Sequence, residues 1–304
     1  MSHFSLSDIP FMTDRTVVVT GANSGIGHVT ARIFAERGAR VVLAVRDTDK
    51  GRAAAATMAG AVEVRRLDLA DLSSVRAFAQ DFTDPIDLLI NNAGVSLPPL
   101  SKTTDGFELQ FGTNHLGHFA LSNLLLPRIR QRVVTVASLA YLVGSIDFSD
   151  LNWERKRYRA NPAYAQSKLA NLLFTAELQR RLSAAGSGVI ATAAHPGISA
   201  TNLMRADDPS LGFRIGKSLI GLVAQNADNG ALPTLYAATG NIPGNSYAGP
   251  GRLMGMRGAP KLVRPAANAR NVSTARRLWE VSEKLTDVTF PLATAHTSGT
   301  DPQS

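Results

Sequence analysis

Between residues 16 and 194, six short runs of mostly β-branched and apolar residues alternate with segments of helical character, and this alternation constrains the fold most. The runs cover residues 16–20, 40–45, 62–67, 86–91, 132–137 and 188–194. Most of them are continuously apolar, which is typical of strands buried on both faces by crossover helices. Strands that alternate with helices at this pitch form a parallel sheet. The sequence therefore predicts an α/β fold with a doubly wound parallel sheet and helices on both faces.

The segments between and after these runs indicate the helices. We expect helices over residues 25–37, 71–81, 105–130, 162–185, 228–239 and 271–286. No linker and no second core of domain size interrupts the pattern, so residues 1–304 are interpreted as a single domain. Within it we expect an N-terminal extension over 1–14, a substrate loop or lid over 196–227, and a flexible tail over 291–304. The apolar stretch 211–224 indicates a lid over a pocket, a membrane contact or a helix packed on the core.

Composition excludes several classes of function. The absence of cysteine excludes disulfides, thiolate nucleophiles and cysteine-ligated metals. The net charge of +8 comes from scattered basic residues without an aromatic ladder, so we expect a basic surface for a phosphorylated ligand and no nucleic-acid partner. No run of about 18 uncharged apolar residues and no signal-peptide-like start is found, which predicts no transmembrane segment and a cytoplasmic location.

The first predicted strand runs directly into the turn TGANSGIG, which opens the first helix. Glycines at such a position allow a tight turn and close approach of the backbone to a diphosphate, and the helix N-terminus favours its negative charge. We therefore expect this turn to bind a dinucleotide cofactor. The candidate residues are Gly21, Asn23, Ser24, Gly25, Ile26 and Gly27.

The end of the second strand indicates which dinucleotide binds. NAD-dependent enzymes place a carboxylate there for the ribose 2′-hydroxyl, whereas Arg46 stands at this point and no acidic residue occurs before Asp47. A guanidinium suits a 2′-phosphate, so we predict NADP(H) as the cofactor. At the ends of the next two strands, Asp68 and Leu69 are placed to bind adenine, and Asn92, Ala93 and Gly94 leave room for the cofactor.

Tyr164 and Lys168 are four residues apart in the stretch NPAYAQSKLAN, so on a helix they face the same side. An unperturbed tyrosine titrates near pH ~10, and a cation beside it favours the phenolate. We therefore expect Lys168 to lower the pKa of Tyr164, so that this residue can donate or accept a proton near working pH.

The motifs TGANSGIG, NNAG, a serine after the fifth strand, Y-x3-K and PG, in this order, resemble the short-chain dehydrogenase/reductase family. The finer pattern LAVRD, FGTNHLGHF and YAQSKLAN is similar to the retinol dehydrogenase-like and WW-domain oxidoreductase-like branch. The resemblance implies a single Rossmann-type domain with strand order 3-2-1-4-5-6-7. It also implies NADP(H) and assembly as a homodimer or homotetramer through the helices bearing Asn114 and Tyr164.

The resemblance also implies roles for individual residues. Tyr164 would donate the proton, Lys168 would hold the nicotinamide ribose, and Ser138 would bind the substrate oxygen. Asparagine is unfavourable inside a helix, so Asn114 implies a backbone distortion that admits a water chain to Lys168. The residues expected along the nicotinamide are Pro196, Gly197, Ile198 and Thr201.

The histidines are interpreted as structural. His115 and His118 have a spacing that could ligate a metal, but no further ligand follows in register, so no metal site is predicted. We expect His195 to pack against the following loop or cap it.

Together these features predict an NADP(H)-dependent oxidoreductase that moves a hydride between nicotinamide and a carbonyl or alcohol group of a fairly hydrophobic small molecule. The alternative is a non-catalytic NADP(H)-binding regulator or scaffold, which the complete set Tyr164, Lys168, Ser138 and Asn114 disfavours. A sugar-nucleotide epimerase would share Y-x3-K, but its glycine turn is usually spaced G-x2-G-x2-G, unlike the turn found here.

Overall fold

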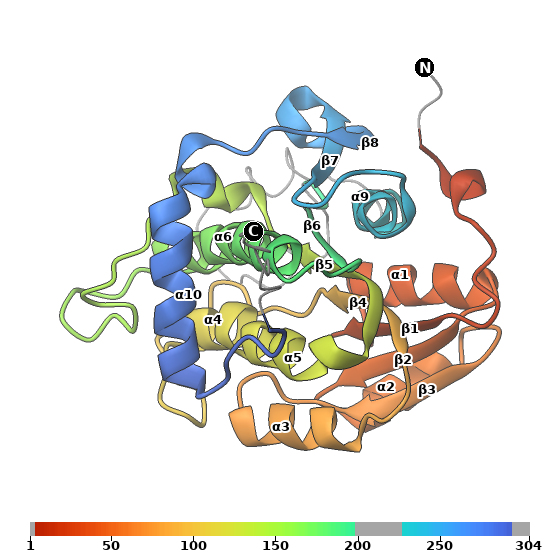
Figure 1. Cartoon of the computed structure of the whole chain (residues 1–304), viewed down its shortest axis with the longest axis horizontal. Helices are drawn as coiled ribbons and strands as arrows, with labels where there is room; N and C mark the ends of the chain where they lie inside the picture. The colour runs from red at the N-terminus through yellow and green to blue at the C-terminus, as the bar shows by residue number, and fades with distance from the viewer. Residues whose placement is uncertain (1–3, 198–226, 294–304) are drawn as a thin grey trace, which may run out of the picture.

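A computed structural model describes residues 4–197 and 227–293 of the chain (Figure 1). Its central sheet has the order β3-β2-β1-β4-β5-β6-β7-β8. Strands β1 to β7 pair in parallel, and β8 is antiparallel to β7. The strands are β1 Thr16–Thr20, β2 Arg40–Val45, β3 Val62–Arg66, β4 Ile86–Asn91, β5 Ile129–Val136, β6 Ile190–Ala194, β7 Tyr247–Arg252 and β8 Arg257–Leu262. The predicted fold class and strand order are confirmed, with β8 added at the edge.

Helices cover both faces of this sheet (Figure 1). Helices α1, α2 and α9 pack on one face, and α3, α5, α6 and α10 on the other. Their bounds are α1 Gly25–Glu36, α2 Thr48–Ala55, α3 Leu72–Asp81, α4 Leu109–Phe111, α5 Gly117–Leu125, α6 Ala160–Ala184, α9 Ala227–Thr239 and α10 Val272–Thr286. Between α4 and α5 lies a π-helical turn, Gly112–Leu116.

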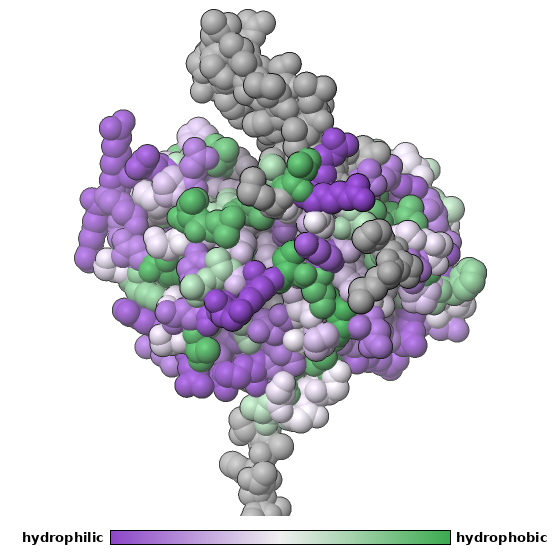
Figure 2. Space-filling view, turned by 90° about the horizontal axis from the view of Figure 1, so that it is seen from above, coloured by the Kyte–Doolittle hydropathy of each residue, from purple (hydrophilic) through white to green (hydrophobic). Residues whose placement is uncertain are grey.

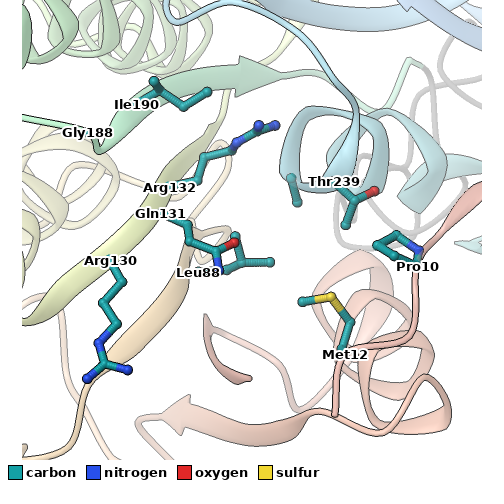
Figure 3. A pocket seen from close by; sticks show the side chains of 10 residues that line it. Pro10, Met12, Leu88, Arg130, Gln131, Arg132, Gly188, Ile190 and Thr239 are labelled. Carbon is teal, nitrogen blue, oxygen red and sulfur yellow. The ribbon is translucent and has the colours of Figure 1, made fainter. Parts of the chain in front are cut away.

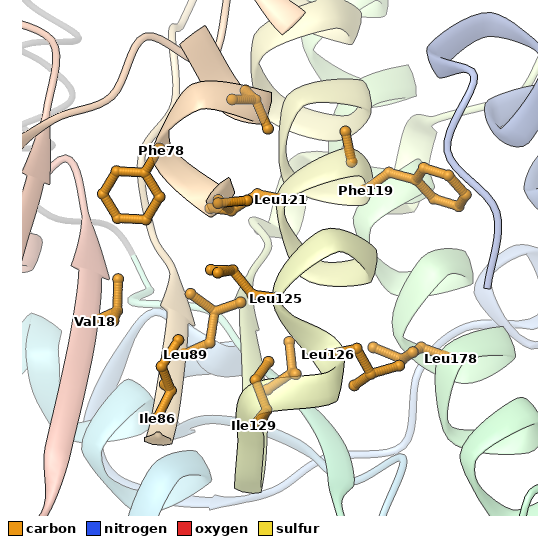
Figure 4. Packing of buried hydrophobic residues seen from close by; sticks show 14 of the residues in the cluster. Val18, Phe78, Ile86, Leu89, Phe119, Leu121, Leu125, Leu126, Ile129 and Leu178 are labelled. Atoms are coloured by element: carbon orange, nitrogen blue, oxygen red, sulfur yellow. The ribbon is translucent and has the colours of Figure 1, made fainter. Parts of the chain in front are cut away.

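The strands are apolar on both faces because each contributes to two cores. In β1, Val17 and Val19 belong to the cluster shared with α1 and α9, whereas Val18 belongs to the cluster on the opposite face. Figure 4 shows the second cluster, where Val18 and Leu89 of the sheet face Phe78 of α3 and Leu121 of α5. Successive side chains of a strand point to opposite faces, so this placement explains the continuous apolar runs.

The long helix predicted over residues 105–130 is wrong in its extent. The chain instead forms α4, the π-helical turn and α5, and β5 already begins at Ile129. A 3₁₀ turn, Leu126–Arg128, separates α5 from β5, and it contains Pro127. Proline lacks the amide proton that would continue an α-helix, which accounts for the early end. The predictions also missed α2 and β8, and they gave no residue range for the seventh strand, which is β7.

Helix α10 covers the outward side of α5 and α6 (Figure 1). The indole of Trp279 stacks on Phe174 of α6 with ring centroids 5.7 Å apart and meets Phe119 of α5 edge-on at 4.8 Å. The guanidinium of Arg181 lies 4.5 Å from the Trp279 ring. The C-terminal helix is thus an integral part of the core next to both helices.

A cavity of about 300 Å³ lies at the amino ends of β4, β5 and β6, which is the edge opposite to that expected for a cofactor. Figure 3 shows Pro10 and Met12 of the N-terminal segment on one side of it and Arg132 and Ile190 on the other. Arg132 donates to the carbonyls of Ala237 and Gly240 at 2.6 and 3.2 Å. These hydrogen bonds join β5 to the end of α9.

The surface is mixed in character. Figure 2 shows one face of the molecule, where separated hydrophobic patches lie among hydrophilic residues. In the two described ranges, no helix combines the length and apolarity needed to cross a membrane.

Candidate active site

The predicted site residues come together at the carboxyl edge of the sheet. Gly21 follows β1, Gly94 lies in the loop after β4, and Ser138 follows β5, while Tyr164 and Lys168 lie in the first turns of α6. Since β1 pairs with β4 and β4 with β5, these segments are neighbours in space. Parallel sheets bind ligands at this edge.

The glycine turn has the form that a diphosphate needs. Gly21 and Gly25 adopt positive φ angles of 65° and 58°, which favour glycine. A Cβ at Gly21 would lie 2.9 Å from Ala93 Cα, and one at Gly27 would lie 2.7 Å from the Gly21 carbonyl oxygen. Ser24, at the N-cap of α1, makes no side-chain capping hydrogen bond, so its hydroxyl does not occupy the first amides of the helix. The turn therefore fits the phosphates of a dinucleotide.

The loop after β4 is fixed to the end of β1 by Thr20. The Thr20 hydroxyl oxygen accepts from the amides of Asn92 and Ala93, both at 2.9 Å. In addition, Asn92 Nδ2 donates to the Thr20 carbonyl at 2.9 Å. The two segments expected to contact the cofactor are thus held together through backbone and side-chain bonds.

At the end of β2, Arg46 is exposed and Asp47 is engaged elsewhere. The Asp47 carboxylate caps α2, accepting from the Lys50 amide at 3.0 Å, and pairs with Lys50 Nζ at 2.9 Å. These hydrogen bonds with Lys50 lower the pKa of Asp47. The Asp47 carboxylate therefore caps α2. The exposed side chain directly after β2 is that of Arg46.

Asp68 and Leu69 occupy different environments after β3. The Asp68 carboxylate accepts from the Ala70 amide at 3.0 Å and is half-buried. Leu69 is buried against α5, where a Cβ on Gly117 would overlap the Leu69 carbonyl oxygen. Of this predicted pair, Asp68 is the better placed to meet a ligand.

Lys168 and Ser138 both contact Tyr164. Lys168 Nζ lies 5.6 Å from the centre of the Tyr164 ring and donates to the Val136 carbonyl at 3.2 Å. Burial raises the pKa of the Tyr164 phenol, and a hydrogen bond with Ser138 offsets part of this effect. Burial also lowers the pKa of Lys168 to about 8. The expected lowering of the Tyr164 pKa by Lys168 is therefore wrong, because desolvation of the phenol dominates.

Asn114 lies in the π-helical turn, so the backbone distortion expected at this residue is present. Its Oδ1 accepts from the Val95 amide at 2.8 Å, and its Nδ2 donates to the Val95 carbonyl and to Ser167 Oγ, both at 3.0 Å. A Cβ on Gly94 would lie 3.1 Å from Asn114 Oδ1 and 3.5 Å from Lys168 Nζ. Asn114 and Lys168 thus approach the same glycine, whereas the water chain between them stays a prediction.

The residues after β6 are only partly described. Gly197 has a φ of 73°, and its amide donates to His195 Nδ1 at 3.3 Å. The His195 ring packs on Tyr247 at 5.1 Å, and burial lowers its pKa to about 4, so the structural role predicted for His195 is confirmed. The predicted Ile198 and Thr201, and the stretch 211–224, lie outside the described residues.

His115 and His118 bind different partners. His115 Nε2 lies 2.8 Å from Ser282 Oγ of α10, and His118 Nε2 lies 2.9 Å from Thr20 Oγ1. No group of side chains able to hold a metal occurs within residues 4–197 and 227–293. Thr20, Ser167 and the contacts of His118 were not predicted from the sequence. The spacing of four residues between Asn114 and His118 could have indicated that the two lie on the same helix face.

Comparison with known proteins gives consistent matches over most of the chain. A family model described as short chain dehydrogenase matches residues 15–211. Retinol dehydrogenase 13 of Homo sapiens is 41% identical over 91% of this chain and 86% of its own length. Retinol dehydrogenase 12 of Mus musculus is 44% identical over 89% and 86%, respectively.

Among solved structures, an uncharacterized protein from Mycobacterium paratuberculosis is 52% identical and superposes with a TM-score of 0.84. The match covers 96% of this chain and 100% of that one. The agreement therefore extends over nearly the whole fold.

Proposed function

This chain belongs to the short-chain dehydrogenase family, and on that premise we propose that it is an NADP(H)-dependent oxidoreductase acting on carbonyl or alcohol groups of hydrophobic small molecules. The observation that carries the proposal is the convergence of Tyr164, Lys168, Ser138 and Asn114 near Gly94, in the loop that Thr20 joins to the glycine turn. When bound, the nicotinamide donates or accepts the hydride. The residues of the chain donate or accept the proton and hold the reacting oxygen in position.

In the direction of reduction, Tyr164 is the proton donor. Its raised pKa keeps the phenol protonated at neutral pH, so a proton is available for the oxygen that gains charge as the carbonyl is reduced. Ser138 has a single hydroxyl proton, which in this structure bonds Tyr164 and which turns to the same substrate oxygen to stabilise that charge. The Lys168 ammonium, cationic below about pH 8, stabilises the Tyr164 phenolate once the proton has left.

NADP(H) is preferred to NAD(H) because of the residues at the end of β2. Arg46 offers a planar guanidinium to a 2′-phosphate. Asp47, the carboxylate that would repel this phosphate, is held at the N-terminus of α2. The glycine turn and the start of α1 bind the diphosphate.

A hydrophobic substrate is supported by exposed apolar residues in loops that follow strands at this edge. Val143 and Leu142, in the 3₁₀ segment after Ser138, are 84% and 53% exposed, and Leu97 in the loop after β4 is 40% exposed. The two dehydrogenases of Homo sapiens and Mus musculus reported above are named for retinol, a hydrophobic alcohol. Retinal, other long-chain aldehydes and aromatic ketones are therefore the first substrates to test. The cytoplasmic location of the protein stays a prediction.

The cofactor assignment predicts tighter binding of NADPH than of NADH by roughly 10-fold or more, since one charge-assisted contact with Arg46 separates them. Fluorescence titration of both cofactors measures this ratio, and Arg46→Asp is expected to reverse it. Arg52→Asp, which changes an exposed arginine on the outer part of α2, is the matched charge control. Equal affinities for both cofactors, unchanged in Arg46→Asp, would show the assignment to be wrong. NADPH binding without turnover on any carbonyl would favour the non-catalytic alternative.

A further inference from the structure

His118 is a buried residue of α5 whose ring lies between the end of β1 and the π-helical turn. Its Nε2 is 2.9 Å from Thr20 Oγ1, and its Nδ1 is 3.0 Å from the carbonyl oxygen of Asn114. The imidazole therefore joins a residue next to the glycine turn to a residue next to Lys168.

The partners determine the tautomer of this ring. The Asn114 carbonyl can only accept, so Nδ1 carries the proton and donates it. Nε2 is then an acceptor. The Thr20 oxygen already accepts from the amides of Asn92 and Ala93, so it can only donate to Nε2, at 2.9 Å, which is nearer than its other acceptor, the Ile90 carbonyl, at 3.3 Å. The neutral imidazole with the proton on Nδ1 gives both ring nitrogens a partner without adding a third donor to the Thr20 oxygen. Burial also lowers the pKa of His118 to about 4.

One end of this network belongs to the cofactor turn. Thr20 directly precedes Gly21 and holds the loop that contains Asn92 and Gly94. A displacement of the Thr20 side chain would therefore move both segments that fit a dinucleotide.

The other end leads to the helix that carries Tyr164. The Asn114 side chain donates to Ser167 Oγ at 3.0 Å, and Ser167 Oγ donates to the Tyr164 carbonyl at 2.8 Å. In a π-helical turn the backbone donors shift from the i+4 to the i+5 position, and the His118 side chain offers the Asn114 carbonyl a donor of its own.

We propose that His118 is a positioning residue that holds the cofactor turn and the start of α6 in register through Thr20 and Asn114. It has no contact with the reacting atoms and acts through these two residues. The inference rests on the proposed function only for its rate measurement, because cofactor binding and the tautomer can be measured without turnover.

Two substitutions of His118 each remove one of its two hydrogen bonds and keep the other. The amide of Gln reaches as far as Nε2, so His118→Gln keeps an acceptor for Thr20 and loses the donor to Asn114. The amide of Asn reaches only as far as Nδ1, so His118→Asn keeps the donor to Asn114 and loses the bond to Thr20. We expect His118→Gln to lower kcat by on the order of 10-fold or more while the Kd of NADPH changes less than about twofold. We expect His118→Asn to raise this Kd by roughly 10-fold with a smaller effect on kcat.

His115→Gln and His115→Asn are the matched controls. His115 is equally buried in the preceding turn, but its partner is Ser282 of α10, outside the site. These variants are expected to lower the melting temperature and leave kcat and the Kd of NADPH unchanged. If both His118 variants lost stability as the His115 variants do and changed neither kcat nor Kd, the positioning role would be refuted.

Nitrogen-15 NMR of the imidazoles in the unaltered protein gives a second test that does not depend on a variant folding. At pH 7 the assigned His118 ring should be neutral with its proton on Nδ1. A proton on Nε2, or a charged ring, would overturn the proposal. Because NMR and NADPH titration need no substrate, they decide the role of His118 even if the substrate panel shows no turnover.

Discussion

Lys168 shows how burial sets the acid–base properties of the site at the scale of a residue. Its ammonium group donates to the Val136 carbonyl below the first turns of α6, and burial lowers its pKa to about 8. Burial acts in the opposite direction on Tyr164, whose pKa is raised because the phenolate is the charged form. At neutral pH the site therefore holds a protonated phenol and a cation, which is the state needed for reduction.

This pair of shifts predicts the pH dependence of carbonyl reduction. Lys168 is cationic below its pKa, so kcat should be level between about pH 6 and 7.5 and fall as the pH rises through about 8. In Lys168→Arg the charge persists to higher pH, so the fall should disappear while the plateau is lower, because a guanidinium is larger. Steady-state rates from pH 6 to 10 measure this. A wild-type rate that stays level up to pH 10 would contradict it.

The sequence pointed to individual residues correctly where a residue type is unfavourable in the predicted secondary structure. Asparagine inside a helix indicated a distortion, and the π-helical turn is present at Asn114. The pKa of Tyr164 was not predictable in the same way. The spacing of Tyr164 and Lys168 indicates their proximity, but the loss of solvent around them depends on strands and helices distant in sequence.

At the scale of elements, a helix or strand was predicted correctly where its own residues favour that conformation, and missed where contacts with other segments impose it. Strand β1, TVVVT, has strong β propensity and was predicted with correct bounds. Strand β7, YAGPGR, contains two glycines and a proline, so its conformation comes from pairing with β6 and β8. Helix α2 was missed because it is short and contains Gly51, where a Cβ would lie 2.7 Å from side-chain atoms of Val45 and Val64.

Helix α10 offers the clearest prediction at this scale. Replacing Trp279 by alanine removes a ring stacked on Phe174 and in edge contact with Phe119, so the free energy of unfolding should fall by about 3–5 kcal/mol. The neighbouring Glu280 is exposed, and Glu280→Ala should change this free energy by less than about 0.5 kcal/mol. Urea unfolding followed by circular dichroism compares the two variants. Equal stabilities would mean that α10 is not part of the core.

At the scale of the whole molecule, α10 also bears on assembly. The family resemblance led us to expect a homodimer or homotetramer formed through the helices bearing Asn114 and Tyr164. That assembly stays a prediction, but within one chain the Trp279 side of α10 covers the outward side of α5 and α6. This arrangement could not be read from the sequence, because it joins segments more than 100 residues apart.

We therefore predict that any self-association of this chain avoids the α5–α6 face. Hydrogen exchange measured at low and high protein concentration should show no concentration-dependent protection in α5, α6 or α10. Light scattering on the same samples reports the mass and shows whether association has occurred. A dimer whose formation protects α5 and α6 would contradict the prediction.

The central claim is that the whole fold serves a hydride transfer for which Tyr164 supplies the proton. The most direct measurement is a single-turnover reaction of the protein with NADPH carrying deuterium at both C4 positions and a hydrophobic aldehyde such as retinal. For the unaltered protein we predict deuterium on the carbonyl carbon of the product, and for Tyr164→Phe a rate lower by about 10²–10⁴-fold with the Kd of NADPH nearly unchanged. Deuterium transfer at the full rate in Tyr164→Phe would contradict the account.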